Sequence, residues 1–160
     1  MSEMRRSDRE VTDPAEIRKI VDEAKILHLG LFDGEYPYVV PMHYGYRAEE
    51  GRLIFYTHGA KEGHKLDLIA ANPKVCVELD CGVEPISGGE IACRYGTTYA
   101  SVIGRGMAEV VTDTEEKILA LKLLMEHQTG RRFEIDARMA DAVGILRIRV
   151  ETFTAKTRTN

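Results

Sequence analysis

Alternation of apolar and polar residues with a period of two recurs along the chain, and this pattern predicts strands. The clearest case is residues 36–46, where Tyr38, Val40 and Met42 share one face. Pro41, on the other face, has no N–H to give to a ladder, so we expect the strand to be an edge strand, or irregular, at that point. The strands expected are residues 26–32, 36–46, 53–57, 75–79, 98–111 and 144–154.

A helical period replaces the alternation in the segments between these strands. Asp13 caps the first helix and Pro14 suits its first turn, while Asp113 starts a later helix in the same way. Asn72-Pro73 ends the second helix, because a proline cannot continue the hydrogen-bond ladder. The helices expected are residues 14–25, 62–71, 114–128 (burying Ile118, Leu121, Leu124 and Met125) and a short turn at 137–142.

Short connections join most of these strands, as the Asp33-Gly34 hairpin signal illustrates. Residues 82–96 are rich in glycine and turn formers and are expected to form a long loop. Hairpin connections favour an antiparallel arrangement over a doubly wound parallel sheet. The sequence therefore predicts a mainly β fold, a six-stranded antiparallel barrel with peripheral helices. We expect one domain over residues 1–160, with residues 1–12 as an N-terminal arm.

Composition narrows the class of protein. The 22 basic and 26 acidic residues give a net charge of -4, which argues against a nucleic-acid partner. No apolar run approaches the ~20 residues that span a bilayer, so we expect no membrane segment. The charged N-terminus carries no secretory pattern. The three cysteines form no CxxC motif and are typical of free thiols in a reducing, cytoplasmic setting.

The segment at residues 55–66 is the richest in candidate chemistry. It joins a strand to a helix N-terminus, and it carries Lys61 and Lys65 four residues apart. Unpaired N–H groups and the positive end of a helix stabilise an anion, so a phosphate site is one reading. The other interpretation is a basic helix start that is solvated and binds no ligand. No Walker, GxGxxG or GxSxG pattern is present, which leaves a cofactor as the source of any difficult chemistry.

Three histidines, His43, His58 and His64, lie in the same part of the chain. Their spacings match no standard zinc motif, so the sequence predicts no metal site. Imidazole is also a haem ligand, and these residues keep a haem-binding barrel open as an alternative.

Several stretches together resemble the pyridoxamine 5'-phosphate oxidase-related FMN-binding split barrels. The stretches are YPYVVPMHYGY at residues 36–46, FYTHGA at 55–60 and GHKL at 63–66 running through to Asn72-Pro73. Met4-Arg5-Arg6 and residues 99–106 are similar to the nitroimidazole-resistance (Nim-like) branch of that family. The resemblance covers nearly the whole chain and implies a split barrel that forms a homodimer, with FMN between the subunits.

The resemblance also implies the residues that bind FMN. The strand at residues 40–43 would lie along the isoalloxazine, and Tyr56 with Thr57 would lie near the ribityl phosphate. His64 and Lys65 would contact the phosphate, and Ser101 would reach the flavin from the other subunit. The full set is Val40, Pro41, Met42, His43, Tyr56, Thr57, Gly63, His64, Lys65 and Ser101.

Two departures from the family bear on activity. The oxidases carry a C-terminal tryptophan and an Arg-x-His substrate motif, whereas this chain has neither. Oxidation of pyridoxamine phosphate is therefore not expected. The resemblance implies an FMN-dependent oxidoreductase that passes electrons from a reduced nicotinamide or other donor to a small, nitroaromatic-like acceptor. The alternatives are a flavin carrier or sensor, and a barrel that binds haem or a deazaflavin.

Overall fold

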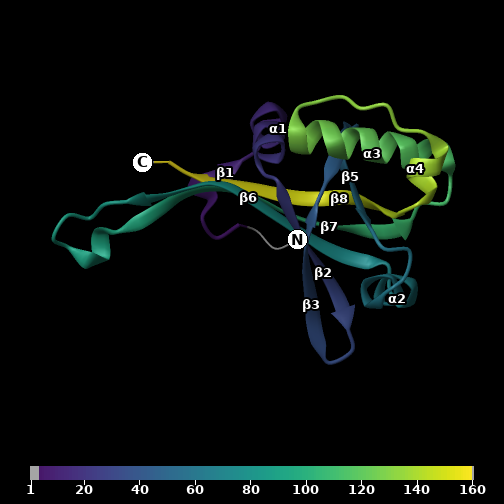
Figure 1. The fold of residues 1–160 in the computed structure, drawn as a ribbon. Coiled ribbons are helices and arrows are strands. Elements are labelled where there is room, and N and C mark those ends of the chain that lie inside the picture. The colour runs from purple at the N-terminus through teal and green to yellow at the C-terminus, as the bar shows by residue number, and fades with distance from the viewer. Residues whose placement is uncertain (1–3, 160) are drawn as a thin grey trace.

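The computed structural model describes residues 4–159, which form one rolled sheet with helices around it (Figure 1). The strands are β1 (Glu10–Val11), β2 (Ile26–Asp33), β3 (Tyr36–His43), β4 (Gly45–Glu49), β5 (Arg52–Gly59), β6 (Lys74–Ile86), β7 (Gly96–Val110) and β8 (Gly144–Arg158). The α-helices are α1 (Pro14–Glu23), α2 (His64–Ala71), α3 (Thr114–Thr129) and α4 (Ala137–Asp141), and two 3-10 turns lie at Ser7–Arg9 and Ala92–Arg94.

The order of the strands shows that the sheet is rolled into a barrel. Neighbouring strands run β3-β2-β6-β7-β8-β5-β4, and every pairing is antiparallel. Strands β3 and β4 are the two ends of this path, yet only Tyr44 separates them in the sequence. The two edges must therefore approach each other, although no ladder closes them. This is a split β-barrel, and the predicted fold class is confirmed.

The predicted number of strands was wrong, since residues 4–159 form eight strands rather than six. The expected strand at residues 36–46 breaks at Tyr44, which is fully buried and whose hydroxyl lies 2.7 Å from the carbonyl of Val21 and 2.8 Å from that of Ala24. Burying and hydrogen-bonding this phenol turns the chain from one edge of the sheet to the other. Gly45 then lies against α3, where a methyl group would overlap the backbone of Leu124. A period of two continues through the break, so the sequence pattern does not reveal it.

The second additional strand is β1, which lies within the expected N-terminal arm and pairs with β8 (Glu10 opposite Lys156). Residues 1–3 of that arm lie outside the described residues.

The expected loop at residues 82–96 is largely a β-ribbon. Strand β6 continues to Ile86 and pairs with β7 beyond a bulge between Cys81 and Glu84. The Thr98 hydroxyl donates to the Gly82 carbonyl at 2.8 Å and accepts from the Glu84 N–H at 3.1 Å, which holds the bulge. The ribbon extends away from the barrel (Figure 1). Cross-strand pairing here outweighs the turn-forming composition.

The helices cover two parts of the core. Val21 and Ile20 of α1 close the barrel interior, where they join Leu29, Phe55 and Val77. A smaller apolar cluster lies between α3 and the outer side of the sheet, and its members are Ile54, Tyr56, Val111, Ala120 and Ile145. The predicted helix caps are confirmed, because Asp13 accepts from Ala15 N–H and Asp113 from Glu116 N–H, both at 2.9 Å.

The predicted buried face of α3 was only partly right. Leu124 is buried, but Ala120 and the stem of Lys117 fill the rest of the face. Lys117 is 8% exposed, and its ammonium reaches Asp141 of α4 at 3.7 Å. Long lysine stems bury readily when the charged end reaches a partner, which a hydrophobic pattern does not register. None of the helices in the described part of the chain is long and apolar enough to cross a membrane.

Candidate functional site

Lys65, in the first turn of α2, has an ammonium group without an anionic partner. Its Nζ lies 3.3 Å from the Met42 sulfur, and this is its one recorded hydrogen bond within residues 4–159. None of the ion pairs recorded for those residues includes it. Partial burial lowers the pKa of Lys65, because desolvation disfavours the charged form. A half-buried ammonium beside a thioether is stabilised by an anion.

Thr57 of β5 contributes a second polar group without a partner. The residue is fully buried, and its Oγ1 has no hydrogen-bond partner in the part of the chain that the structure describes. Gly59, two residues further along β5, points to the same side as Thr57, and a methyl group there would lie 3.5 Å from Lys65 Nζ. We call Met42, Thr57, Gly59 and Lys65 the Lys65 cluster.

The beginning of α2 adds backbone donors to this cluster. Gly63 precedes the helix with φ of 136°, a conformation that favours glycine, and its carbonyl accepts from the N–H groups of Leu66 and Asp67. The first N–H groups of a helix have no partner inside the helix, and the helix dipole makes this end positive. The arrangement of hydroxyl, ammonium and helix start suits a phosphate group.

His64 lies at the same helix start but faces a carboxylate. Its Nε2 is 2.9 Å from Asp33 Oδ2, and its ring meets Tyr38 edge-on at 5.2 Å between centroids. The hairpin between β2 and β3 therefore holds the imidazole. Sequence reasoning treated Asp33 as a turn residue alone, because nothing in the local pattern connects it with His64.

Strand β3 presents its predicted flavin-binding residues to opposite sides. Val40 and Met42 turn toward the barrel interior, whereas Pro41 and His43 are exposed. The strand pairs with β2 alone, so its other edge carries backbone N–H and C=O groups outside the ladder. Those groups are available to a ligand with donors and acceptors of its own. The prediction that Pro41 lies on an edge strand is confirmed.

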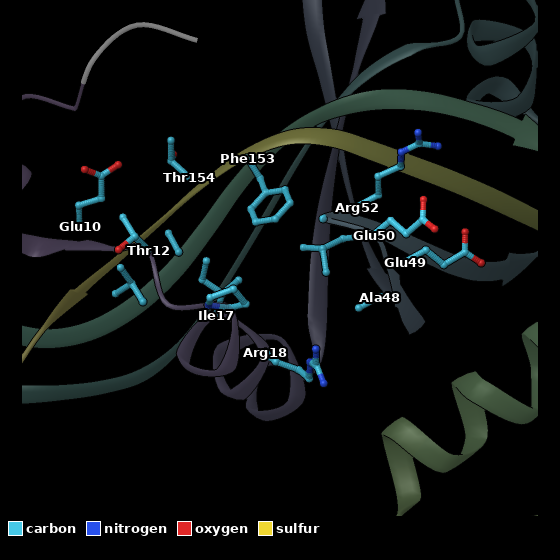
Figure 2. A pocket seen from close by; sticks show the side chains of 15 residues that line it. Glu10, Thr12, Ile17, Arg18, Ala48, Glu49, Glu50, Arg52, Phe153 and Thr154 are labelled. Atoms are coloured by element: carbon cyan, nitrogen blue, oxygen red, sulfur yellow. The ribbon is translucent and has the colours of Figure 1, made fainter.

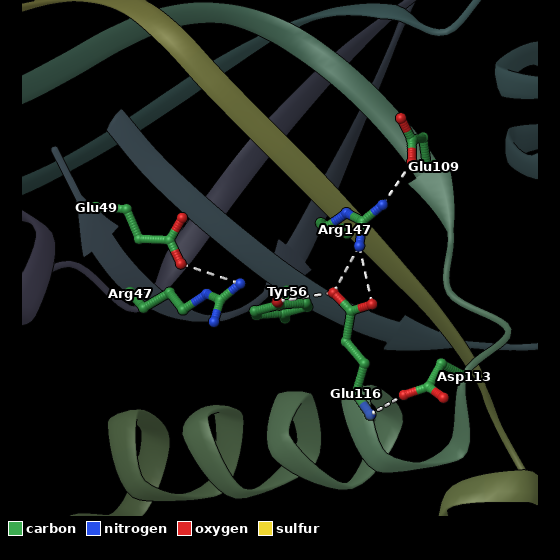
Figure 3. Close-up of polar contacts among 7 residues, drawn as sticks. All are labelled: Arg47, Glu49, Tyr56, Glu109, Asp113, Glu116 and Arg147. Atoms are coloured by element: carbon green, nitrogen blue, oxygen red, sulfur yellow. Dashed lines mark hydrogen bonds and ion pairs between the residues drawn. The ribbon is translucent and has the colours of Figure 1, made fainter. Parts of the chain in front are cut away.

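Tyr56 points away from the Lys65 cluster. Its hydroxyl donates to Glu116 of α3 at 3.0 Å, and Arg147 clamps the same carboxylate at 2.7 and 2.8 Å (Figure 3). Burial, together with the hydrogen bond to Glu116, raises the pKa of Tyr56 to about 12. A third group, Glu109, pairs with Arg147 at 2.6 Å. Tyr56 thus helps to hold α3 on the sheet, while its neighbour Thr57 faces the cluster.

Ser101 lies on β7 toward the ribbon, opposite Asp80 and Lys156. Ala108 lies in the part of β7 next to α2. Its N–H donates to the carbonyl of Pro73, just after that helix, at 2.8 Å. The two positions are seven residues apart in the sequence, which is about 23 Å along the strand. No recorded contact joins Ser101 to the Lys65 cluster in the described chain.

Two hollows in the surface lie elsewhere. One of about 400 Å³ opens between α1, the turn after β4 and strand β8, with Ile17 and Phe153 at its floor (Figure 2). Its rim carries three glutamates and two arginines, so it does not favour a phosphate. The larger, about 790 Å³, lies on the outer side of β2, β3, β6 and β7. None of the ten predicted site residues, all of which are described, lines either hollow.

Comparison with known proteins agrees with this fold. The profile of the family described as Pyridoxamine 5'-phosphate oxidase matches residues 13–157. The structure of a candidate 5-nitroimidazole antibiotic resistance protein of Bacteroides thetaiotaomicron superimposes with a TM-score of 0.76 at 30% identity, over 92% of this chain and 86% of that one. No curated protein sequence matches the chain.

More distant structures share the fold alone. The flavocytochrome Anf3 of Azotobacter vinelandii has a TM-score of 0.77 at 19% identity, over 99% of this chain and 73% of its own. An FAD- and heme-binding protein of Mycobacterium smegmatis has a TM-score of 0.76 at 15% identity, over 95% of this chain and 74% of that one.

The fold is a split β-barrel, and the Lys65 cluster lies at the start of α2. The chain belongs to the pyridoxamine 5'-phosphate oxidase family of flavin-binding split barrels.

Proposed function

We propose that this protein is an FMN-dependent oxidoreductase that passes electrons from a reduced nicotinamide or other donor to a small, nitroaromatic-like acceptor. One observation carries the proposal: the Lys65 ammonium, without a carboxylate partner, lies at a helix start beside Gly59, and the unpaired Thr57 hydroxyl lies on the same side of β5 two residues earlier. These groups fit the terminal phosphate of FMN. The similarity to the candidate 5-nitroimidazole resistance protein supports the acceptor class.

The cluster, the start of α2 and strand β3 hold different parts of the cofactor. Lys65 supplies a charge-assisted contact to the phosphate, and Thr57 donates from its hydroxyl. The first N–H groups of α2 complete the phosphate site. The unpaired edge of β3 at residues 40–43 runs along the ring system and orients it. The bound flavin supplies the redox chemistry, and the chain supplies binding and orientation.

We further propose that the flavin lies between two subunits of a homodimer. The outer side of β2 and β3 exposes large apolar side chains, with Phe32 63% and Val39 59% exposed. A monomer seldom leaves such a patch bare. None of the four most prominent hollows formed by residues 4–159 is lined by a residue of the Lys65 cluster, as expected for a site that a second subunit completes. Ser101 would then reach the flavin held by the partner.

A cytoplasmic location is part of the same proposal. Cys76, Cys81 and Cys93 are all unpaired. Free thiols persist in a reducing compartment.

The visible absorption spectrum of freshly purified protein, repeated after loading with FMN and desalting, tests the cofactor. We expect the two flavin bands with one FMN per chain, and bleaching under anaerobic NADH or NADPH. Reoxidation by a nitroaromatic acceptor would then complete the cycle. Flavin bands that do not bleach would indicate a carrier or sensor, a Soret band would indicate haem, and a featureless spectrum after loading would refute flavin binding.

A further inference from the structure

Three metal-ligating side chains converge on the outer side of the sheet, away from the Lys65 cluster. His28 of β2 lies directly across from Glu78 of β6, and its Nδ1 is 2.9 Å from Glu78 Oε2. Asp80 follows Glu78 by two residues and so lies on the same side of β6. One ligand atom from each of the three residues falls within 4.8 Å of the others.

The two carboxylates of this group lack a basic partner. Within residues 4–159, Glu78 pairs with His28 alone, and Asp80 takes part in no recorded ion pair. The positions opposite them on β7 are Ile103 and Ser101, which carry no charge. Arg105, two residues beyond Ile103, lines the same hollow as His28 and Glu78 but forms no recorded ion pair within residues 4–159. Two carboxylates close together repel each other, and a divalent cation bound between them would offset their charge.

We propose that His28, Glu78 and Asp80 bind a divalent first-row transition-metal ion such as Zn²⁺. One imidazole nitrogen and two carboxylate oxygens are ligands that such ions accept. Zinc bonds to these atoms are about 2.0–2.2 Å, so the ligand atoms must lie within about 4.4 Å of one another. The side chains of His28 and Glu78 are 41% and 36% exposed, which leaves them free to close that small difference.

The site leaves a coordination position for an exogenous ligand. The hollow of about 790 Å³ that His28 and Glu78 line is also lined by Phe32 and Val39 of the proposed subunit interface, so in the dimer the ion would lie beside that interface. Three protein ligands leave at least one position of a tetrahedral ion unfilled, which is the pattern of sites that bind water or a small anion. All three ligands come from one chain, so the ion needs neither the flavin nor a second subunit.

The sequence predicts no metal site because fifty residues separate His28 from Glu78. The register of β2 against β6 brings them together, and no local spacing motif encodes that register. The histidines that were considered from the sequence, His43, His58 and His64, do not take part.

Calorimetric titration of the chelator-treated, full-length protein with ZnCl₂ tests the proposal. We expect one ion per chain, and a loss of affinity of about tenfold or more in each of His28→Gln, Glu78→Gln and Asp80→Asn. His58→Gln, which removes an exposed histidine at the end of β5, is the matched control and should bind as the wild type does. Cobalt added in place of zinc should give visible d–d absorption that His28→Gln abolishes.

Two outcomes would overturn the inference. Wild-type protein that takes up no stoichiometric zinc has no such site. Equal zinc binding by His28→Gln and His58→Gln would show adventitious binding to exposed groups. Thermal unfolding of each variant identifies a misfolded one, and His28→Gln remains decisive because glutamine can still donate to Glu78. Flavin content is measured in parallel, so a failed zinc titration leaves the FMN proposal unaffected.

Discussion

The Lys65 ammonium lies 3.3 Å from the Met42 sulfur, and so it links the start of α2 to the end of β3. A thioether is a weak acceptor and leaves most of the charge unsatisfied. The phosphate-binding and ring-binding parts of the proposed site are therefore joined through one side-chain pair. This pairing makes Lys65 the residue whose removal is most informative.

Lys65→Ala is expected to weaken FMN binding. A hydrogen bond to a charged group contributes about 1.5–3 kcal/mol, which corresponds to roughly 10- to 150-fold in Kd. Quenching of flavin fluorescence on titration into flavin-free protein measures the change. Lys61→Ala is the matched control, because Lys61 is exposed in the same segment. Equal losses in both variants would show that general charge, rather than Lys65, holds the phosphate.

The pH dependence of FMN affinity gives Lys65 a second signature. Burial lowers its pKa below the ordinary value of 10.5. The phosphate contact requires the ammonium, so affinity should be lost as the pH rises through that lowered pKa. In Lys65→Arg the guanidinium stays charged, and the alkaline loss should disappear. If FMN affinity still falls at alkaline pH in Lys65→Arg, the group that titrates is not Lys65.

Thr57→Val should stabilise the flavin-free protein and weaken its binding of FMN. The Thr57 hydroxyl is buried without a partner, and an unsatisfied buried polar group costs about 1–3 kcal/mol. We expect the flavin-free variant to be more stable by about 1 kcal/mol in urea unfolding, while its FMN Kd rises several-fold. Thr157→Val is the contrasting control, because its hydroxyl donates to the Tyr99 carbonyl at 3.2 Å and its loss should destabilise. A Thr57→Val variant that binds FMN as the wild type does would exclude this hydroxyl from the site.

The sequence predicts local features well because their causes are local. Asp13 and Asp113 cap helices through bonds to N–H groups two and three residues away, and both caps are present. The alternation in β3 correctly places Val40 and Met42 on one face, and the structure shows that Val40 packs on the barrel core and Met42 is buried. The resemblance to the split barrels supplied what local chemistry does not, namely that the sheet rolls into a split barrel.

Features that depend on distant parts of the chain were beyond the sequence pattern. Tyr44 breaks a continuous alternation because its hydroxyl finds carbonyls at the end of α1, about twenty residues earlier. Tyr56 and Thr57 alternate across β5 as in any strand, yet both are buried, because the barrel core covers one side of β5 and α3 covers the other. Asp33 contacts His64 through the packing of a hairpin on a helix. Each of these results from tertiary contact rather than from propensity.

Val39→Asp tests the proposed subunit interface. A charge placed in the apolar patch on the outer side of β3 should convert a dimer of 18.0 kDa chains into monomers, because an unpaired charge is costly to bury. Size-exclusion chromatography with light scattering measures the mass, and flavin content should fall with it. Leu119→Asp, at a 38% exposed position on α3, should stay dimeric. Wild-type protein that is monomeric and still holds FMN would refute the shared site.

His127 should make the stability of the fold depend on pH. Its Nε2 lies 2.8 Å from the Ala24 carbonyl, and its ring stacks on Tyr44 with centroids 4.5 Å apart. Burial lowers the pKa of His127 below its ordinary value of 6.5, and the nearby Lys25 charge acts in the same direction. Below pH 6.5 the unfolded chain therefore binds a proton that the folded chain does not.

The sign of the effect follows from this difference in proton uptake. The stabilisation is complete above pH 6.5 and is lost as the pH falls from 6.5 toward the lowered pKa, with a slope of at most about 1.4 kcal/mol per pH unit. His127→Gln, which retains a donor for the Ala24 carbonyl, should remove this slope from urea unfolding measured between pH 5 and 8. His58→Gln provides the comparison, since His58 is exposed at the end of β5 and lies outside this contact. If the wild type and His127→Gln lose stability in parallel below pH 6.5, then His127 is not the titrating group.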